Sequence, residues 1–515
     1  MSTRRGSWPR NPAIYQIYPR SFLDTTGSGE GDLPGITQKL DHVAALGVDA
    51  IWVSPFFVSP MSDGGYDVAD HQAVNPRFGT MADFEALVAR AHDLGLKVMI
   101  DQVLNHTSCR HPLFLAACDG DDAAAECYLF RDPKPDGTQP NNWLSQFGPP
   151  AWTWAHKRRQ YYFHQFLACQ PSLNLRHDTV QAMHRQELAF WREKGVDGFR
   201  FDAVTSYLWD ESLKDNPPAT PEVQDRVSGE NFVPYTYQDH EHDILPGDGA
   251  AYTEKLREWA GEDAYLIGES TSGNKSLELA MEFTKEGRLD GVYTTDLPEN
   301  RGAPEIWARI FEETELPRLP KWLSSHDQPR HITRCGDGSD RDARFFALLM
   351  AFLPGPWLIY QGEELGLPQP QLSEEETVDP LDLLYWPDGP GRDGARVPIP
   401  WEDAPNFGFS TGKPWLPMRW DSGHAVARQS EATVMGFYAN CLAARKEQGW
   451  ADAALTEWSL EDGLLEVRTE GAGGTWRALF NYGEAVRRCD PTQPYLASQP
   501  CYGDLLGRTA AVWRE

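Results

Sequence analysis

Short runs of apolar, β-branched and aromatic residues recur along the chain, and helical patterns lie between many of them. The runs cover residues 13–18, 50–56, 97–103, 198–204, 264–270, 291–297, 321–327 and 357–363. Runs that stay apolar at consecutive positions are typical of parallel strands, because both faces of such a sheet are buried. Eight strands with helices between them predict an α/β fold of the (β/α)8 TIM-barrel type.

The clearest helix lies between the second and third runs, over residues 80–94. Its apolar positions fall on one helical stripe: Phe84, Leu87, Val88, Ala91 and Leu94. Thr80 and Asp83 have the spacing of an N-cap residue and its partner in a capping box. Gly95 follows as a natural end of the helix.

Two long insertions and a change of pattern near the C-terminus divide the chain. Residues 107–170, rich in Pro, Trp and Asn, separate the third strand from its helix, and residues 205–250 form a second long loop. A helix near 430–447 closes the barrel, and turn signals at 461–463 and 471–474 then separate short strands. We therefore expect a barrel in residues 1–106 and 171–447, an inserted subdomain in 107–170 and a small β-domain in 448–515.

Composition and charge exclude several classes of protein. Hydrophobic residues make up 41% and charged residues 24%, as in ordinary globular proteins, and the net charge of -29 excludes a basic face for nucleic acid or anionic membranes. There is no apolar stretch of the roughly 18 residues that a membrane span needs. The first residues lack the apolar region of a signal peptide, and the eight cysteines form no CxxC pair. These features predict a cytoplasmic protein with reduced thiols.

Polar side chains stand at the ends of four predicted strands. They are Asp101, Asn105 and His106 after the third, Arg200 and Asp202 at the fourth, Glu269 at the fifth, and His326 and Asp327 at the seventh. The carboxyl ends of barrel strands form one face, where active sites are built. Each of these residues alone has an ordinary structural role, such as a helix cap, an ion pair or a core histidine. Their shared position at one face favours a functional site.

Asp202 and Glu269 end neighbouring strands, which lie about 4.8 Å apart in a sheet. Glycoside hydrolysis with retention needs a nucleophilic carboxylate and a carboxylic acid about 5–5.5 Å apart. Arg200 lies two residues before Asp202 on the same face of the strand, and its charge favours the ionised form of Asp202. Anionic neighbours in a less polar site raise the pKa of Glu269, as an acid catalyst requires.

The segments DQVLNH (101–106), GFRFDAV (198–204), IGES (267–270) and SSHDQPR (324–330) resemble the four hallmark segments of the α-amylase family of glycoside hydrolases. GVDAIWVSP (47–55), QPSLN (170–174) and GPWLIYQGEELG (355–366) resemble accessory segments, and the likeness extends from about residue 13 to 401. IYQIYPRSF, GDLPGI, SDGGYD and GRDGARVPIPW are most similar to bacterial α-glucosidases and oligo-1,6-glucosidases.

This resemblance implies roles for individual residues. Asp202 would be the nucleophile, Glu269 the acid/base, and Asp327 the third carboxylate, which binds sugar hydroxyls as the ring distorts. The implied substrate-binding residues are Asp63, Tyr66, His106, Phe147, Phe166, Arg200, His326, Arg330 and Arg396. Among them, Asp63 and Arg396 match the pair that closes the pocket around the non-reducing end in exo-acting members. Phe147 and Phe166 resemble aromatic pocket walls, with a pure core role equally open.

The sequence departs from the family pattern at two informative places. The metal loop of the family would be formed by Asp24, Thr26, Ser28, Glu30 and Asp32. Hydroxyl groups at two of these positions are weaker ligands than carboxylates for Ca2+ or Mg2+, so a structural ion stays open, while the chemistry itself needs no cofactor. Ala203, after the predicted nucleophile, is smaller than the valine that accompanies α-1,6 preference in relatives, and this favours α-1,4 linkages.

The resemblance therefore implies an exo-acting retaining α-glucosidase that takes a small α-glucoside or oligosaccharide and forms a covalent glucosyl-enzyme. An α-glucosyltransferase that passes glucose to a sugar or alcohol is the first alternative, because the same intermediate serves both reactions. An inactive sugar-binding relative is the second alternative, and the presence of all three carboxylates disfavours it.

Overall fold

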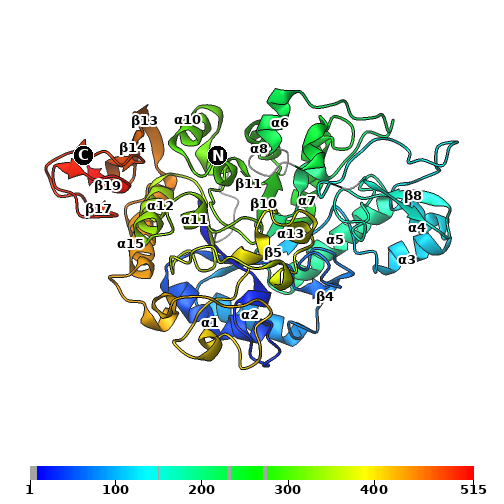
Figure 1. Cartoon of the computed structure of the whole chain (residues 1–515), viewed down its shortest axis with the longest axis horizontal. Coiled ribbons are helices and arrows are strands. Elements are labelled where there is room, and N and C mark those ends of the chain that lie inside the picture. The colour runs from blue at the N-terminus through cyan, green and yellow to red at the C-terminus, as the bar shows by residue number, and fades with distance from the viewer. Residues whose placement is uncertain (1–7, 149, 229–232, 271–274) are drawn as a thin grey trace.

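The computed structural model describes residues 8–148, 150–228, 233–270 and 275–515. Its centre is a parallel barrel sheet surrounded by helices (Figure 1). The barrel strands are β1 (Ala13–Ile17), β2 (Ala50–Val53), β5 (Lys97–Gln102), β9 (Gly198–Phe201), β10 (Tyr265–Ser270), β11 (Gly291–Thr294) and β12 (Trp357–Tyr360). They follow one another in the order β11-β10-β9-β5-β2-β1-β12, and all neighbours are parallel.

The predicted strand at 321–327 is the exception, since no strand is assigned there. Lys321 forms one parallel bridge with Trp357 of β12, and the chain bends at a second bridge between Ser325 and Gln328. Pro320, which has no N–H to donate, precedes the segment. On the other side the Trp322 indole Nε1 donates to the carbonyl oxygen of Thr294 at 2.7 Å, so a side chain replaces part of the backbone ladder.

A helix follows each of the eight segments and covers the outside of the barrel. These helices are α1 (Leu33–Ala45), α2 (Met81–Asp93), α5 (Asp178–Glu193), α7 (Pro246–Ala260), α8 (Ser276–Phe283), α10 (Pro304–Glu313), α12 (Asp340–Phe352) and α15 (Val434–Glu447). The barrel interior is a separate apolar cluster that includes Ile14, Trp52, Met99, Ile267 and Leu358. The (β/α)8 barrel predicted from the apolar runs is confirmed.

The two predicted helices are present with small differences at their ends. Thr80 caps α2, and both hydrogen bonds of its capping box with Asp83 are formed. Gly95, just beyond the helix, has a φ of +79°, a left-handed value that favours glycine. The other helix, α15, begins at Val434 rather than near 430, with Thr433 at its N-cap.

Both insertions carry secondary structure. Residues 107–170 contain α3 (Pro112–Asp119), α4 (Asp122–Glu126) and a three-stranded sheet in the order β6-β8-β7 (Phe130–Arg131, Gln160–Phe163 and Trp152–Ala155). The second loop contains α6 (Pro221–Ser228) and a 3-10 turn at Pro234–Tyr237. Shorter elements near the barrel mouth are β3 (Phe57–Val58), β4 (Asp70–Val74), α9 (Asp296–Glu299), α11 (His331–Arg334), α13 (Pro380–Leu384) and α14 (Arg392–Ala395).

The C-terminal β-domain lies at one end of the molecule (Figure 1). Its sheet has the order β13-β14-β15-β19-β17 (Ala454–Glu461, Leu464–Gly471, Gly474–Asn481, Thr509–Arg514 and Leu496–Ala497), and β16 (Arg487–Arg488) pairs with β18 (Asp504–Leu505). Asp462 and Gly463 both have positive φ in the two-residue turn between β13 and β14. Among the described residues, no helix has the length and apolar character that crossing a membrane requires.

Candidate active site

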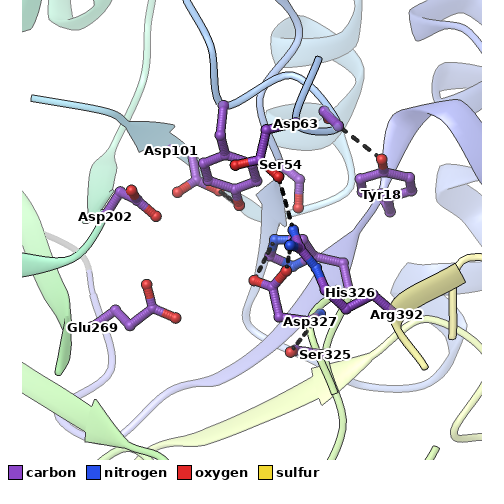
Figure 2. A network of polar contacts seen from close by, with 12 residues as sticks. Tyr18, Ser54, Asp63, Asp101, Asp202, Glu269, Ser325, His326, Asp327 and Arg392 are labelled. Atoms are coloured by element: carbon purple, nitrogen blue, oxygen red, sulfur yellow. Dashed lines mark hydrogen bonds and ion pairs between the residues drawn. The ribbon is translucent and has the colours of Figure 1, made fainter. Parts of the chain in front are cut away.

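A pocket of about 210 Å³ opens at the carboxyl ends of the barrel strands. Asp202 follows β9, Glu269 lies on β10, and Asp327 belongs to the bent segment after Lys321; all three line the pocket. Figure 2 shows Asp202 and Glu269 side by side, facing Asp327 across the pocket. The structure therefore brings the three carboxylates together, as the sequence pattern predicts.

One buried guanidinium group connects two of these carboxylates to a third acidic residue. Arg200 Nη1 lies 2.7 Å from Asp202 Oδ1 and 2.5 Å from Asp101 Oδ1, and Arg200 Nη2 lies 2.6 Å from Glu269 Oε2. The Arg200 side chain is fully buried, so no water screens these contacts. A single positive charge thus serves three acidic groups.

Burial and the shared cation Arg200 act in opposite directions on the pKa values of these acidic groups. Burial raises the pKa of Asp202 to about 7, against the opposing effect of Arg200, and burial raises the pKa of Asp101 to about 6. Burial also raises the pKa of Glu269. Arg200 lowers the pKa of Asp202, in the direction that the sequence analysis expects, whereas burial and the nearby anions Asp101 and Asp327 raise it.

Asp327 has the opposite electrostatic setting. His326 Nε2 lies 2.9 Å from Asp327 Oδ2, while Arg392 Nη2 and Arg396 Nη2 lie 2.9 and 3.0 Å from Asp327 Oδ1. Burial alone would raise the pKa of Asp327, but His326 and the two arginines together hold it well below its usual range. Asp327 is therefore a permanent anion in the pocket.

The ion pair that involves Asp63 differs from the expected one. Arg392 Nη2 donates a hydrogen bond to Asp63 Oδ1 at 3.1 Å, and Arg392 lines the pocket. Arg396 instead donates to Asp379 and Asp327 and, through Nε, to the carbonyl oxygen of His326 at 2.7 Å. Arg392 therefore forms the pair with Asp63 that the sequence motif suggested for Arg396. Arg396 does not line the pocket and instead binds Asp327 and Asp379.

Four other expected sugar-binding side chains line the pocket: Tyr66, His106, Phe147 and Phe166. The Tyr66 ring stacks on His326 at 5.2 Å between ring centroids, and its hydroxyl donates to Asp101 Oδ2 at 3.2 Å. Phe147 and Phe166 meet edge to face at 6.0 Å between ring centroids. His326 lies beside the pocket, where Gln16 Nε2 contacts its Nδ1 at 2.8 Å.

Arg330 is placed differently from the sequence expectation. Its guanidinium group donates to the carbonyl oxygens of Gln361 and Ala395 and lies over the rings of Tyr360 and Trp420. It does not line the pocket, and the side chain is buried. Its contacts hold the loop after β12 in place rather than facing a substrate.

Several pocket residues carried no recognised signal in the sequence. They are Gln146, Gln170, Thr295, Gln328, Leu381, Pro390 and Arg392, and they line the pocket together with Ala203, which the sequence analysis had singled out. Gln170 and Arg392 lie inside the quoted segments QPSLN and GRDGARVPIPW and could have been found there. Gln170 Nε2 donates to Asp63 Oδ2 at 3.0 Å, whereas Leu381 and Pro390 come from a long irregular loop without any periodic pattern.

Protein donors surround the acidic side chains of the loop at 24–32, which the sequence analysis left open as a metal site. Asp24 Oδ1 accepts hydrogen bonds from Thr26 N and Gly27 N at 2.9 Å, and Asp24 Oδ2 accepts from Gly29 N at 2.7 Å and Ser410 Oγ at 2.6 Å.

The other two acids of this loop also have donors. Asp32 Oδ1 accepts from Gly35 N at the start of α1, and Asp32 Oδ2 accepts from Thr25 N. Glu30 is paired with Arg20 and Arg77. These N–H and O–H groups therefore compete with a cation for the carboxylate oxygens of the loop.

Comparison with known proteins agrees with this site. The family model for the α-amylase catalytic domain matches residues 16–453, so the chain belongs to the α-amylase family of glycoside hydrolases. The chain is 43% identical over 478 residues to a probable α-glucosidase of Rhizobium meliloti, covering 90% of this chain and 85% of the relative. It is 34% identical over 453 residues to an oligo-1,6-glucosidase of Heyndrickxia coagulans, covering 79% of both chains. The protein is a glycoside hydrolase of the α-glucosidase type.

Similar solved structures include a glucosyl transfer enzyme and a trehalulose synthase. An α-glucosyl transfer enzyme, XgtA, superposes with a TM-score of 0.90 at 38% identity, covering 98% of this chain and 99% of that one. A trehalulose synthase superposes with a TM-score of 0.85 at 27% identity, covering 99% of this chain and all of the other.

Proposed function

We propose that the protein is an exo-acting, retaining α-glucosidase in which Asp202 is the nucleophile and Glu269 the acid/base. The contact of both carboxylates with the one guanidinium group of Arg200 carries this proposal. Two carboxyl groups bound to one guanidinium fit the separation of about 5–5.5 Å used with retention better than the 6.5–9.5 Å used with inversion.

The first half of the reaction forms a covalent glucosyl-enzyme. A carboxylate oxygen of Asp202 attacks the anomeric carbon, and Glu269 gives its proton to the glycosidic oxygen as that bond breaks. In the second half Glu269 removes a proton from water, whose oxygen attacks the anomeric carbon and releases Asp202. The raised pKa of Glu269 suits its first role, and the anionic Asp327 offers oxygens to the sugar hydroxyls.

The closed end of the pocket supports action on terminal glucose. Asp63 and Arg392 are bonded to each other, and Arg392 also contacts Asp327. This charged cluster, with Phe147 and Phe166 beside it, lines a pocket of about 210 Å³, a size that suits a single terminal sugar. Ala203, a small residue, lines the pocket. We infer from it that short α-glucosides with α-1,4 linkages are the preferred substrates.

The decisive experiment compares the wild type with D202N on p-nitrophenyl α-glucoside. We expect turnover by the wild type and a loss on the order of 10³-fold or more in D202N, as when a covalent nucleophile is removed. NMR of the first product formed should give the α-anomer of glucose. Release of the β-anomer, or equal activity of D202N, would exclude the proposed mechanism, and a panel of maltose, isomaltose, sucrose and trehalose then ranks substrates.

Glucosyl transfer is the second candidate, and the likeness to a glucosyl transfer enzyme at 38% identity over nearly the whole chain favours it. The same glucosyl-enzyme reacts with an alcohol in place of water. Incubation of maltose with glycerol separates the two reactions, because hydrolysis yields only glucose, whereas transfer yields a glucosylglycerol.

A further inference from the structure

Residues 379–385, here called the strap, include α13 (Pro380–Leu384) (Figure 1) and lie at the pocket, which Leu381 lines. Its first residue, Asp379, caps α13 by accepting from Leu381 N and Asp382 N at 3.0 Å. The other oxygen of Asp379 accepts from Arg396 Nη1 at 2.9 Å. One end of the strap is therefore fixed to the cationic groups that hold Asp327.

The other end of the strap is bonded to a pocket wall that is distant in sequence. Tyr385 Oη donates to the carbonyl oxygen of Phe147 at 2.9 Å. Phe147 lines the pocket beside Phe166, and the Arg392 guanidinium carbon lies 5.9 Å from the centre of the Phe147 ring. The Tyr385 hydroxyl group thus holds the backbone of a residue whose ring faces the substrate space.

The turn after Phe147 is shaped around this hydroxyl group. Gly148 has a φ of +91°, and a Cβ atom there would lie 1.8 Å from Tyr385 Oη and 3.2 Å from Pro234 Cδ. A side chain at position 148 would therefore collide with the strap. Three long loops meet at this glycine: the insertion at 107–170, the loop at 205–250 and the strap.

We propose that Tyr385 is a positioning residue of the sugar pocket: its hydroxyl group fixes the Phe147–Gly148 turn and thereby the aromatic wall of the glucose subsite. This inference rests on the proposed function. Tyr385 does not line the pocket itself, so it acts through Phe147. Leu381, on the same strap, lines the pocket directly, and the bond of Tyr385 sets the distance between these two walls.

The first test is the kinetics of Y385F, which removes one hydroxyl group and keeps the ring. We expect the KM for p-nitrophenyl α-glucoside to rise about fivefold, the factor that one neutral hydrogen bond corresponds to, with kcat changed less than about twofold. The split is expected because Phe147 contacts the bound sugar and not the reacting atoms. Y161F is the matched control: Tyr161 Oη donates to the carbonyl oxygen of Gly137 at 3.1 Å, away from the pocket, so its KM should stay unchanged.

The second test is a double-mutant cycle with G148A, read as the melting temperature. G148A alone should lower the melting temperature strongly, because its methyl group collides with the Tyr385 hydroxyl group. In the Y385F background the nearest ring atom, Cζ, lies 3.1 Å from the new methyl group, so part of the loss should be recovered.

The outcomes separate the inference from the proposed function. A raised KM in Y385F together with recovery of G148A supports the inference. An unchanged KM, or a lower melting temperature without any change in KM, overturns it and leaves the α-glucosidase proposal intact. Strictly additive effects of G148A and Y385F also overturn it, because they show that the two positions are not in contact. A wild type without turnover overturns both proposals.

Discussion

The protonation of the pocket is set by single residues around Arg200. Asp101 forms an ion pair with Arg200 and also accepts a hydrogen bond from the Trp52 indole Nε1 at 2.8 Å. Its own charge is one of the causes that raise the pKa of Asp202 to about 7. Because the acidic groups interact strongly, the pH dependence of the enzyme belongs to the cluster and not to Asp202 alone.

D101N should therefore move the acid limb of the kcat/KM profile to lower pH. The nucleophile must be ionised, so activity falls as the pH falls through the pKa of Asp202. Removing the negative charge of Asp101 lowers that pKa and extends activity to lower pH. A pH–rate profile for both proteins measures the shift. D197N, at the other end of β9, is the control and should keep the wild-type profile; an acid limb that stays in place or moves upward in D101N would contradict the explanation.

Residue-level roles were only partly predictable from the sequence. The three carboxylates end apolar runs, and this pattern places them on one face. Arg392 and Arg396 lie four positions apart in one motif and on one helical turn, so the sequence alone does not distinguish which of them faces Asp63. The ionisation of Asp202 depends on how many acids share Arg200, which only the packed site reveals.

At the scale of elements, the sequence predicted the helices and strands whose apolar residues follow a regular pattern. The α2 helix has its apolar stripe and its capping box, both of which are local in sequence. The seventh barrel segment has an apolar run but follows Pro320 and bends at Ser325, so it pairs through Lys321 without forming a strand. The strap at the pocket could not be predicted, because contacts with Phe147 and the arginines, distant in sequence, hold it in place.

The loop at 24–32 allows a direct test at this scale. Because N–H and O–H donors occupy Asp24, we expect EDTA to change the melting temperature by less than about 1 °C. S410A removes the hydroxyl group bonded to Asp24 Oδ2 at 2.6 Å, and hydrogen bonds to charged groups contribute about 1.5–3 kcal/mol. The S410A variant should therefore melt at a lower temperature, in EDTA as in buffer. A marked loss of stability in EDTA that Ca2+ restores would show that the loop holds an ion after all.

At the scale of the whole molecule, two buried basic side chains, Lys321 of the seventh barrel segment and Arg445 of α15, bind the chain between α12 and β12. Lys321 Nζ donates to the carbonyl oxygens of Pro354 at 2.6 Å, Gly355 at 2.8 Å and Pro356 at 3.2 Å. Arg445 of α15 donates to the carbonyl oxygens of Ala351 and Leu353 at the end of α12, and to that of Gly355 in the turn. The turn leads into β12, so these side chains complete the closure where the seventh segment forms no strand.

K321M should consequently destabilise the whole barrel while leaving the pocket chemistry in place. The carbonyl oxygen of Pro354 would lose its donor, at a cost of about 1–3 kcal/mol. The carbonyl oxygens of Gly355 and Pro356 would each lose one bond but keep Arg445 Nη2 and the Lys321 backbone N–H as donors. The gain from no longer burying a basic group offsets part of the loss. We expect a net loss of about 1–2 kcal/mol, measured as a lower melting temperature. K157M, at an exposed lysine paired with Asp119, should leave the melting temperature nearly unchanged. Equal melting temperatures for the two variants would mean that the backbone alone closes the barrel and that Lys321 only fills space.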